Sequence, residues 1–314
     1  MTHRDAREIR PKAILIAGPT ASGKSAAALS LAERLGGTVI NADSMQVYRE
    51  LRILTARPSQ ADLGRAPHRL YGAIPAAEAY SVGHWLADAA SAIAEAKGAG
   101  RVPILTGGTG LYFKALGEGL APVPEVPGEI RQYWRDRAAV IGAEALHREL
   151  GVSDPAMAAR LSPTDPQRLV RALEVIDATS ISLAEWHGAS AAPILAPDDV
   201  LKLVIAPKLE ALYAATETRF DAMIEAGATE EVRALLALGP DPGLPAMRAH
   251  GVSELKNYLS GSSSRAEAIA KAKTETRRYA KRQMTWLRRF MKDWEWAPDA
   301  AAGVDAVHAR RVTP

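Results

Sequence analysis

The chain has 314 residues, of which 47% are apolar and 24% charged. This composition is typical of a globular protein with two domains, or one domain with an insertion, and excludes a disordered or fibrous chain. The absence of cysteine excludes disulfides, thiolate chemistry and Cys-ligated zinc. Because the first apolar run is too short for a signal-peptide core or a membrane span, we expect a cytoplasmic protein with no membrane association.

The most specific signal is a phosphate-loop motif, GxxxxGK[ST], directly after the apolar run Ala13–Ala17. A strand before the loop and a helix after it, over about Ser25–Leu35, let successive backbone N–H groups face a di- or triphosphate. Lys24 adds a cation on the phosphate oxygens, and the Ser25 hydroxyl is placed to coordinate Mg²⁺. The phosphate-binding set is Gly18, Pro19, Thr20, Ala21, Ser22, Gly23, Lys24 and Ser25. The motif predicts a phosphate site but does not identify the reaction.

Strand and helix signals alternate through the first part of the chain. Thr38–Ala42 and Val102–Thr106 are short apolar runs that indicate buried strands, and Ser81 is placed to cap the helix between them. The alternation predicts an α/β fold, with a P-loop NTPase-like parallel sheet core flanked by helices. Ligands of such sheets bind at the carboxyl ends of the strands, where the phosphate loop, Asp43 and the Gly107–Gly110 turn would converge.

The pattern changes near Pro122, after which the periodicity is helical as far as Trp186. Asp165 and Pro166 form an N-cap followed by proline at the first helical position, which opens a helix. Strand character returns at Val200–Ile205, followed by helices over about 209–226 and 229–238. We therefore expect three parts: a first core segment, 1–122; an all-helical insertion domain, 123–198; and a second core segment, 199–314, that ends in a basic helix.

The net charge of +3 is unevenly distributed. Residues 271–292 contain nine Lys and Arg against the single acid Glu275, which gives +8 here and leaves −5 for the remainder. This segment belongs to the predicted last helix, from about Arg265 to Lys292. A solvated amphipathic helix is the plain interpretation of a charge run. Because a nine-to-one imbalance leaves no ion-pair lacing to explain the cations, we favour contact with nucleic acid.

Five segments, taken in order, resemble the tRNA dimethylallyltransferases: the phosphate loop, NADSMQVYR (41–49), GGTGLY (107–112), QRLVRALEV (167–175) and TRRYAKRQMTW (276–286). The resemblance covers about Ala13–Trp286. It implies transfer of a dimethylallyl group from dimethylallyl diphosphate to N6 of adenosine 37, just 3′ of the anticodon in tRNA, with Mg²⁺ as cofactor. The products would be N6-isopentenyladenosine and diphosphate. The phosphate loop would then hold a leaving group instead of a nucleotide to be cleaved.

The resemblance also implies roles for single residues. Asp43 would be the general base that accepts from the adenine amine, and Thr109 and Arg219 would complete the catalytic set on the diphosphate. The flipped-out base and its neighbours would contact Asp43, Ser44, Met45, Gln46 and Thr109. The anticodon stem-loop would be bound by Arg131, Gln167, Arg168, Leu169, Val170 and Arg171. The RNA backbone would be bound by Thr276, Arg277, Arg278, Tyr279, Ala280, Lys281, Arg282 and Gln283.

Two segments depart from the family pattern. The usual Ile-Gly-Tyr-Lys-Glu is replaced within residues 249–254, where only a glycine and a glutamate agree, and the usual Thr-Ala-Lys-Pro has Arg57 in place of lysine. His250 has no second histidine or acid at metal-ligand spacing, so we interpret it as a structural or loop histidine. Without cysteines, the chain does not carry the C-terminal zinc finger of eukaryotic relatives.

Two other functions stay open. A small-molecule kinase would use the same sheet and loop, and an isopentenyltransferase for free adenine nucleotides has a related core. The basic helix and the Gln167–Arg171 helix favour RNA, because neither is needed for a small metabolite. A kinase would also carry a lid with several arginines near the phosphate loop, and none is identifiable. We expect the protein to be a monomer.

Overall fold

A computed structural model describes residues 11–189, 192–196 and 200–312. Most of the polar N-terminal segment, on which the expectation of no signal peptide rests, lies outside these residues. The chain forms two compact units, the first from Met1–Gly117 with Ile194–Pro314 and the second from Glu118–Pro193. The sequence placed the insertion at 123–198, and the last two residues of that range are not among those described.

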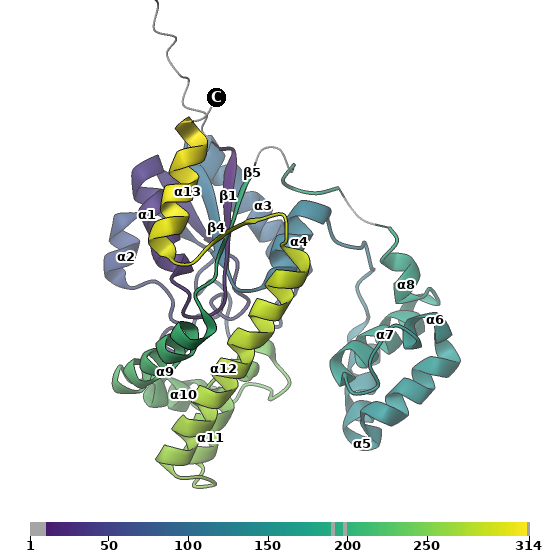
Figure 1. Ribbon diagram of the computed structural model, residues 1–314. Coiled ribbons are helices and arrows are strands. Elements are labelled where there is room, and N and C mark those ends of the chain that lie inside the picture. The colour runs from purple at the N-terminus through teal and green to yellow at the C-terminus, as the bar shows by residue number, and fades with distance from the viewer. Residues whose placement is uncertain (1–10, 190–191, 197–199, 313–314) are drawn as a thin grey trace, which may run out of the picture. The chain divides into compact units, whose positions relative to one another are not determined.

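The first unit is built on a six-stranded sheet in which every pairing is parallel, in the order β3-β2-β4-β1-β5-β6 (Figure 1). The strands are β1 Ala13–Ala17, β2 Gly37–Asn41, β3 His68–Arg69, β4 Val102–Gly107, β5 Val200–Ile205 and β6 Glu295–Ala297. In the central strand, Ile14 lies opposite Ile104 of β4 and Leu201 of β5. The predicted α/β fold with a parallel sheet is confirmed.

Helices cover both faces of this sheet because its strands are apolar on both sides. The helices of the first unit are α1 Lys24–Leu35, α2 Gln60–Arg65, α3 Val82–Gly98, α4 Gly110–Glu118, α9 Leu209–Glu225, α10 Ala228–Ala237, α11 Val252–Leu259, α12 Arg265–Phe290 and α13 Ala300–Val312. On one face, Trp85 of α3, Phe113 of α4 and Leu287 of α12 pack on Leu15. On the other face, the hydrophobic core includes residues of α1 and α13.

The sequence predicted that the basic helix α12 would be the last element of the chain, and this prediction is wrong. Helix α12 is followed by β6, which pairs with β5, and by α13, whose Val304 and Val307 join the core on the α1 face. Both elements were missed for a physical reason. Three residues of strand carry no readable periodicity, and the first turn of α13, an alanine-rich run, lacks an apolar stripe.

A third hydrophobic core lies among α9, α10, α11, α12 and the segment that follows β2. Phe220 of α9, Val232 of α10, Leu255 of α11 and Ala272 of α12 meet Tyr48 there. The long helix α12 therefore contributes to two cores, this one with Ala272 and the sheet face with Leu287. Its middle turns pass beside the phosphate loop.

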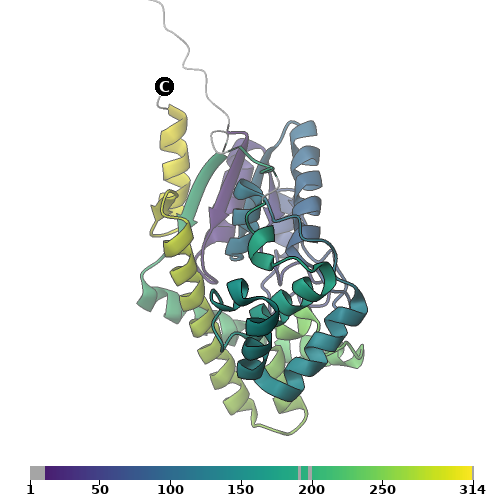
Figure 2. The same ribbon diagram turned by 90° about the vertical axis from the view of Figure 1, so that its right-hand side faces the viewer.

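Among its described residues, the second unit has helices and no strands; the helices are drawn in teal in Figure 2. They are α5 Gly128–Ser153, α6 Pro155–Ala158, α7 Pro166–Thr179 and α8 Leu183–Trp186. Asp165 caps α7 by accepting from the Arg168 N–H, with Pro166 at the first helical position as predicted. A kink divides α5 at Gly142, whose φ of 74° is a left-handed conformation that glycine adopts without strain. Leu146, Leu150 and Leu173 form the core between α5 and α7.

Candidate active site at the carboxyl edge of the sheet

The phosphate loop joins β1 to α1 in a tight turn. Gly23 has a φ of 90°, which leaves the first turn of α1 open at its N-terminus. A Cβ on Gly18 would lie 2.6 Å from Ser22 Oγ and 2.7 Å from the Ile205 carbonyl, so only glycine fits this close approach. Ser22 Oγ is buried and has no hydrogen-bond partner among the described residues. Unused donors at a helix N-terminus make a cradle suited to phosphate oxygens.

Lys24 lies at the base of this cradle and is only 9% exposed. Its ammonium donates to the Pro19 carbonyl at 3.1 Å, which leaves two of its three donors for other acceptors. Burial lowers the pKa of Lys24 from 10.5 to about 8; the charge of Asp43 opposes this shift and that of Arg219 adds to it. The side chain is therefore a cation at neutral pH whose charge is poorly solvated, and an anion in the loop would stabilise it.

Asp43 follows β2 and is held by its own backbone neighbours. Its N–H donates to Asn41 Oδ1 at 2.9 Å, and its Oδ1 accepts from the Met45 N–H at 2.9 Å. Asn41 is itself fixed, because its amide donates to the carbonyl oxygens of Asp43 and Leu70. The other carboxylate oxygen, Oδ2, has no hydrogen bond with the described residues. Asp43 thus offers one free acceptor from a rigid turn.

Thr109, in the turn after β4, contacts the same segment. Its Oγ1 accepts from the Ser44 N–H at 2.9 Å and donates to Ser44 Oγ at 3.3 Å. A Cβ on Gly107 would lie 1.9 Å from the Ala42 carbonyl oxygen, so the glycine lets this turn close on the segment after β2. The convergence of the phosphate loop, Asp43 and the 107–110 turn, predicted from the strand order, is confirmed.

Arg219 completes the charged part of the site from α9. Burial lowers its pKa and the charge of Asp43 opposes the shift, so the two side chains interact. Within the described ranges Arg219 forms no ion pair. Together with Lys24, Arg219 gives this region two cations against the single acid Asp43. That balance suits a di-anionic or more highly charged ligand.

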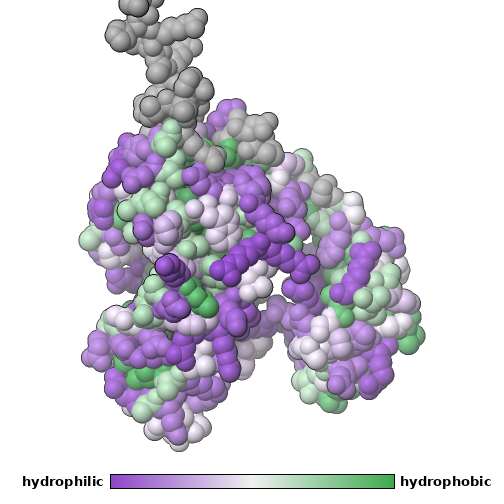
Figure 3. All heavy atoms as spheres, viewed as in Figure 1, coloured by the Kyte–Doolittle hydropathy of each residue, from purple (hydrophilic) through white to green (hydrophobic). Residues whose placement is uncertain are grey.

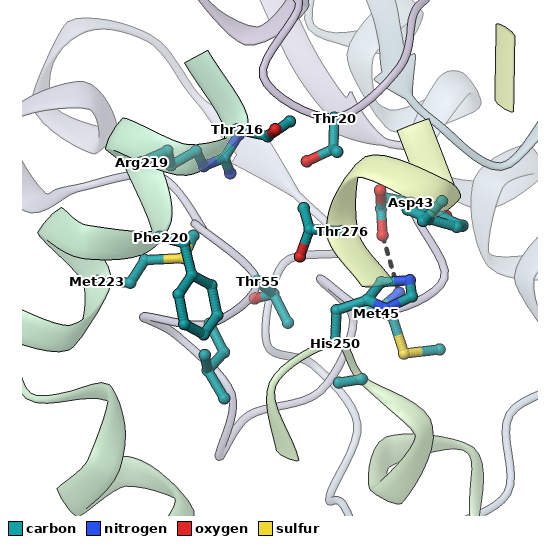
Figure 4. Close-up of a pocket in the computed structure, with 13 residues that line it drawn as sticks. Thr20, Asp43, Met45, Thr55, Thr216, Arg219, Phe220, Met223, His250 and Thr276 are labelled. Atoms are coloured by element: carbon teal, nitrogen blue, oxygen red, sulfur yellow. Dashed lines mark hydrogen bonds between the residues drawn. The ribbon is translucent and has the colours of Figure 1, made fainter. Parts of the chain in front are cut away.

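One pocket of the first unit contains Asp43 and Arg219 (Figure 4). Its other lining residues are Thr20, Met45, Leu54, Thr55, Thr216, Phe220, Met223, Ala249, His250, Thr276 and Tyr279. Figure 4 shows Arg219, Thr216 and Thr20 at one end, with Phe220 and Met223 from α9 along one wall. The pocket is thus charged near the phosphate loop and apolar along α9. The apolar wall was not predicted, because Phe220 and Met223 belong to no motif and resemble ordinary core positions of a helix.

His250 lines this pocket, although the sequence suggested only a structural or loop histidine. Its ring packs on Tyr279 with 4.4 Å between the centroids. Burial lowers the pKa of His250, and Arg282 adds to this, while Glu254, Asp43 and Glu275 oppose it. The imidazole is therefore neutral at pH 7. No motif in the sequence indicated that this histidine faces a pocket.

The basic helix α12 differs from its sequence interpretation in its ion pairing. Lys273 pairs with Asp221 and Arg277 with Glu217, both acids on α9, and Arg278 pairs with Glu275. The expectation that no ion pairs explain its cations is wrong for these three residues, because two of the acids come from another helix. Lys281, Arg282 and Arg288 are exposed and have no ion pair within the described part of the chain. Hydrophilic side chains dominate the surface over α12 (Figure 3).

Two further residues of the predicted RNA set on α12 face inward. Ala280 is fully buried and belongs to a core with Leu212 and Met284. Gln283 is 6% exposed and hydrogen-bonds within the protein. Their side chains do not present a surface to a ligand, so their assignment to RNA contact is corrected. Thr276 and Tyr279 line the pocket.

In the second unit, the structure brings Arg131 of α5 and Arg171 of α7 together around Glu174. Burial raises the pKa of Glu174, and Arg171, Arg135 and Arg131 oppose this shift. Arg131 also pairs with Glu125 at 3.2 Å, and its Nε is buried without a partner among the described residues. A cluster of three arginines against one buried acid keeps a positive potential on this face.

The other residues predicted on α7 divide between surface and core. Gln167 and Arg168 are exposed, and Arg168 pairs with Asp165 at 3.3 Å. Leu169 is fully buried in the core of the second unit, and Val170 packs against that core. The prediction that Leu169 contacts RNA is corrected for its side chain, because burial in the α5–α7 core leaves it no exposed surface.

For a metal ion, the described residues contain no cluster of three or more His, Cys, Asp or Glu side chains. Mg²⁺ in phosphate sites takes most of its ligands from water and phosphate oxygens and needs only one or two from the protein. The exposed hydroxyl of Ser25 fits such a partial set. Over the described ranges, no helix is long and apolar enough to cross a membrane.

Comparisons with known proteins agree with these features. The family model for IPP transferase matches residues 46–290, and that for isopentenyl transferase matches residues 11–79. A tRNA dimethylallyltransferase of Bradyrhizobium sp. (strain ORS 278) is 54% identical over 93% of this chain and 96% of its own length. That of Azorhizobium caulinodans is 51% identical over 95% and 96%.

Two solved structures are similar to this chain over most of its length. The full-length tRNA isopentenylpyrophosphate transferase from Bacillus halodurans has a TM-score of 0.67 and 32% identity, covering 96% of this chain and 95% of that one. A eukaryotic dimethylallyltransferase acting on tRNA has a TM-score of 0.77 and 27% identity, covering 93% and 74%. The resemblance inferred from five sequence segments is confirmed. The chain belongs to the IPP transferase family.

Proposed function

We propose that this transferase moves a dimethylallyl group from dimethylallyl diphosphate to N6 of the adenosine just 3′ of the anticodon in tRNA and releases diphosphate. One observation carries the proposal. A phosphate cradle with a buried lysine, an acid with a free carboxylate oxygen and an apolar wall border the same site in the first unit. A diphosphate ester with a short hydrocarbon chain, attacked by a neutral amine, needs these three environments.

The cradle acts on the leaving group. As the allylic C–O bond breaks, negative charge accumulates on the diphosphate oxygens, where loop N–H groups, Lys24 and Arg219 stabilise it. The Ser25 hydroxyl would hold Mg²⁺ at this place, and the ion would supply further neutralisation of the charge on the leaving group. These interactions strengthen toward the transition state, because the charge they oppose is only fully developed when the bond is broken.

Asp43 acts on the acceptor. The adenine N6 forms a bond to the allylic carbon as the C–O bond breaks, and the amine then carries an excess proton. The free Oδ2 of Asp43 accepts that proton, since Oδ1 is used by the Met45 N–H. Phe220 and Met223 line the apolar wall and hold the dimethylallyl chain away from water, which limits hydrolysis of the donor.

For the RNA, we assign the exposed Lys281 and Arg282 of α12 and, in the second unit, Arg131 with Gln167, Arg168 and Arg171. Arginines of this kind contact phosphates without reading sequence, and the target base must leave its stack to reach the pocket. A metabolite kinase needs neither the exposed cations of α12 nor the arginine cluster around Glu174. An enzyme acting on tRNA would work in the cytoplasm, where its substrate is found.

An assay with separated donors and acceptors tests the proposal. Unmodified tRNA transcript is incubated with dimethylallyl diphosphate and Mg²⁺, and parallel reactions contain ATP in place of the donor or AMP in place of the tRNA. Nuclease digestion and mass spectrometry should find dimethylallyl adenosine only in the first reaction. Modification of AMP but not tRNA would favour the free-nucleotide enzyme, and phosphorylation by ATP would favour a kinase.

A further inference from the structure

Gln283 connects the basic helix to both loops of the donor site. Its Oε1 accepts from the Thr20 N–H at 2.9 Å, inside the phosphate loop. Its Nε2 donates to the Gly108 carbonyl at 3.0 Å, inside the turn after β4. The side chain is 6% exposed, and the two partners lie 263 and 175 residues away along the chain. One amide thus provides hydrogen-bond partners for a part-buried N–H in the phosphate loop and for a buried carbonyl in the turn after β4.

A glutamine side chain meets both demands from this position, since its amide carries an acceptor and a donor. Glutamate accepts but does not donate when ionised, lysine donates but does not accept, and asparagine is one methylene shorter. Gly108, in the turn after β4, also lies close to this amide. A Cβ on Gly108 would lie 2.2 Å from Gln283 Nε2, so any larger residue at this position would displace the amide from its contacts.

We propose that Gln283 is a positioning residue that fixes the phosphate loop against the 107–110 turn, and that it does not contact RNA. The proposal rests on the proposed function, in which this loop holds the donor diphosphate. Thr20 lies in the cradle, and Thr109, next to Gly108, bonds the segment that carries Asp43. By holding both loops, Gln283 sets the distance between the leaving group and the general base.

The helix α12 carries both Gln283 at the donor site and the cations that we assign to RNA binding. Lys281 and Arg282 are exposed on α12, while Gln283, the next residue, faces the phosphate loop. A change at Gln283 should therefore affect the donor and spare the RNA, and a change at Lys281 or Arg282 should do the reverse. This separation is measurable because the affinities for diphosphate and for tRNA are determined in separate titrations.

The first test compares Gln283→Met with Thr285→Ala, an exposed residue on the same helix. Three quantities are measured: hydrogen exchange of the Thr20 amide by NMR, affinity for inorganic diphosphate by calorimetry, and tRNA affinity. In Gln283→Met, Thr20 should exchange about tenfold faster or more, while Leu15 and Ile16 amides in β1 stay protected. Diphosphate affinity should fall about tenfold, the scale of one lost hydrogen bond, with tRNA affinity within twofold. Thr285→Ala should match the wild type.

A double-mutant cycle approaches the same contact from the other side. Gly108→Ala alone should weaken diphosphate binding, because the new Cβ displaces the Gln283 amide. Added to Gln283→Ala, the same substitution should cost little more, since the clash is gone. The Gly108→Ala variant keeps Gln283 and so tests the contact even if variants of Gln283 prove too unstable to purify.

Three results would overturn the proposal: an unchanged Thr20 exchange rate, additive effects in the cycle, or a loss of tRNA affinity with diphosphate binding intact. The last would restore Gln283 to the RNA surface. Failure of the proposed function has a different signature. If the wild type does not bind diphosphate or modify tRNA, while Thr20 exchange still depends on Gln283, the positioning contact stands and the assigned ligand is wrong.

Discussion

The affinity for diphosphate should fall as the pH rises above neutrality, because Lys24 loses its charge. Burial lowers the pKa of this residue from 10.5 to about 8 in the free protein. Bound diphosphate places negative charge beside the ammonium and raises that pKa again. Binding of diphosphate above pH 8 is therefore coupled to proton uptake by Lys24, and the apparent affinity falls with each further pH unit.

The size of the effect follows from the pKa. About nine-tenths of the Lys24 side chains are protonated at pH 7 and about one-tenth at pH 9, so the apparent dissociation constant should rise about tenfold over this interval. Arg219 does not contribute to this slope. Burial lowers its pKa, but an arginine stays protonated in proteins at pH 9.

Calorimetric titration of the protein with inorganic diphosphate between pH 6.5 and 9.5 measures this slope. The ligand's own last ionisation increases its negative charge and would strengthen binding, so it cannot imitate the expected loss. Lys24→Arg serves as the matched control, since its guanidinium keeps its charge across the range and its profile reports the ionisation of the ligand alone. Relative to this control, the wild type should lose about tenfold in affinity between pH 7 and pH 9, and equal profiles in the two proteins would refute the reasoning.

Three further outcomes are expected. Asp43→Asn keeps an acceptor for the Met45 N–H but removes the general base. Turnover should therefore fall about 10²–10⁴-fold while tRNA affinity and Tm stay unchanged. Near-normal turnover would mean that the carboxylate has only a structural role. The Lys281→Ala/Arg282→Ala variant should lower the slope of log K for tRNA against log[salt] by about 1.5, and an unchanged slope would mean that this face is only solvated. Glu231 accepts from the N–H groups of Arg52, Ile53 and Leu54 at 2.6, 2.7 and 2.9 Å and so fixes the segment from which Leu54 lines the pocket. Glu231→Ala should therefore lower the free energy of unfolding in urea by about 2–3 kcal/mol. The control is Glu230→Ala, because the neighbouring Glu230 is exposed and pairs with Arg233. Equal losses of stability in the two variants would contradict the role assigned to Glu231.

The core of the fold could be predicted because its signals are local. Ala13–Ala17 followed by GxxxxGK[ST] defines a strand, a loop and a helix within two dozen residues, and the strand order then brings Asp43 and the 107–110 turn to one edge. Helix caps at Ser81 and Asp165 were equally local and were confirmed. Such features depend on backbone geometry that a short stretch of sequence determines.

The rest of the site depends on tertiary contacts that no short segment encodes. Arg277 was assigned as unpaired because its partner, Glu217, lies 60 residues away on another helix. Gln283 was grouped with its exposed neighbours, although helical geometry turns it about 100° from Arg282 and into the core. His250 and the apolar wall at Phe220 gain their meaning only when α9 and the turn before α11 meet.

The central claim is that the phosphate loop holds a leaving group, and the stoichiometry of one reaction tests it most directly. Wild-type protein, tRNA, dimethylallyl diphosphate and Mg²⁺ are combined without ATP, and released diphosphate and the dimethylallyl content of the tRNA are measured in the same samples over time. The account predicts that one diphosphate appears for each modified adenosine from the first turnover onward. Modification that requires ATP turnover, or diphosphate release without modification of the tRNA, would contradict it.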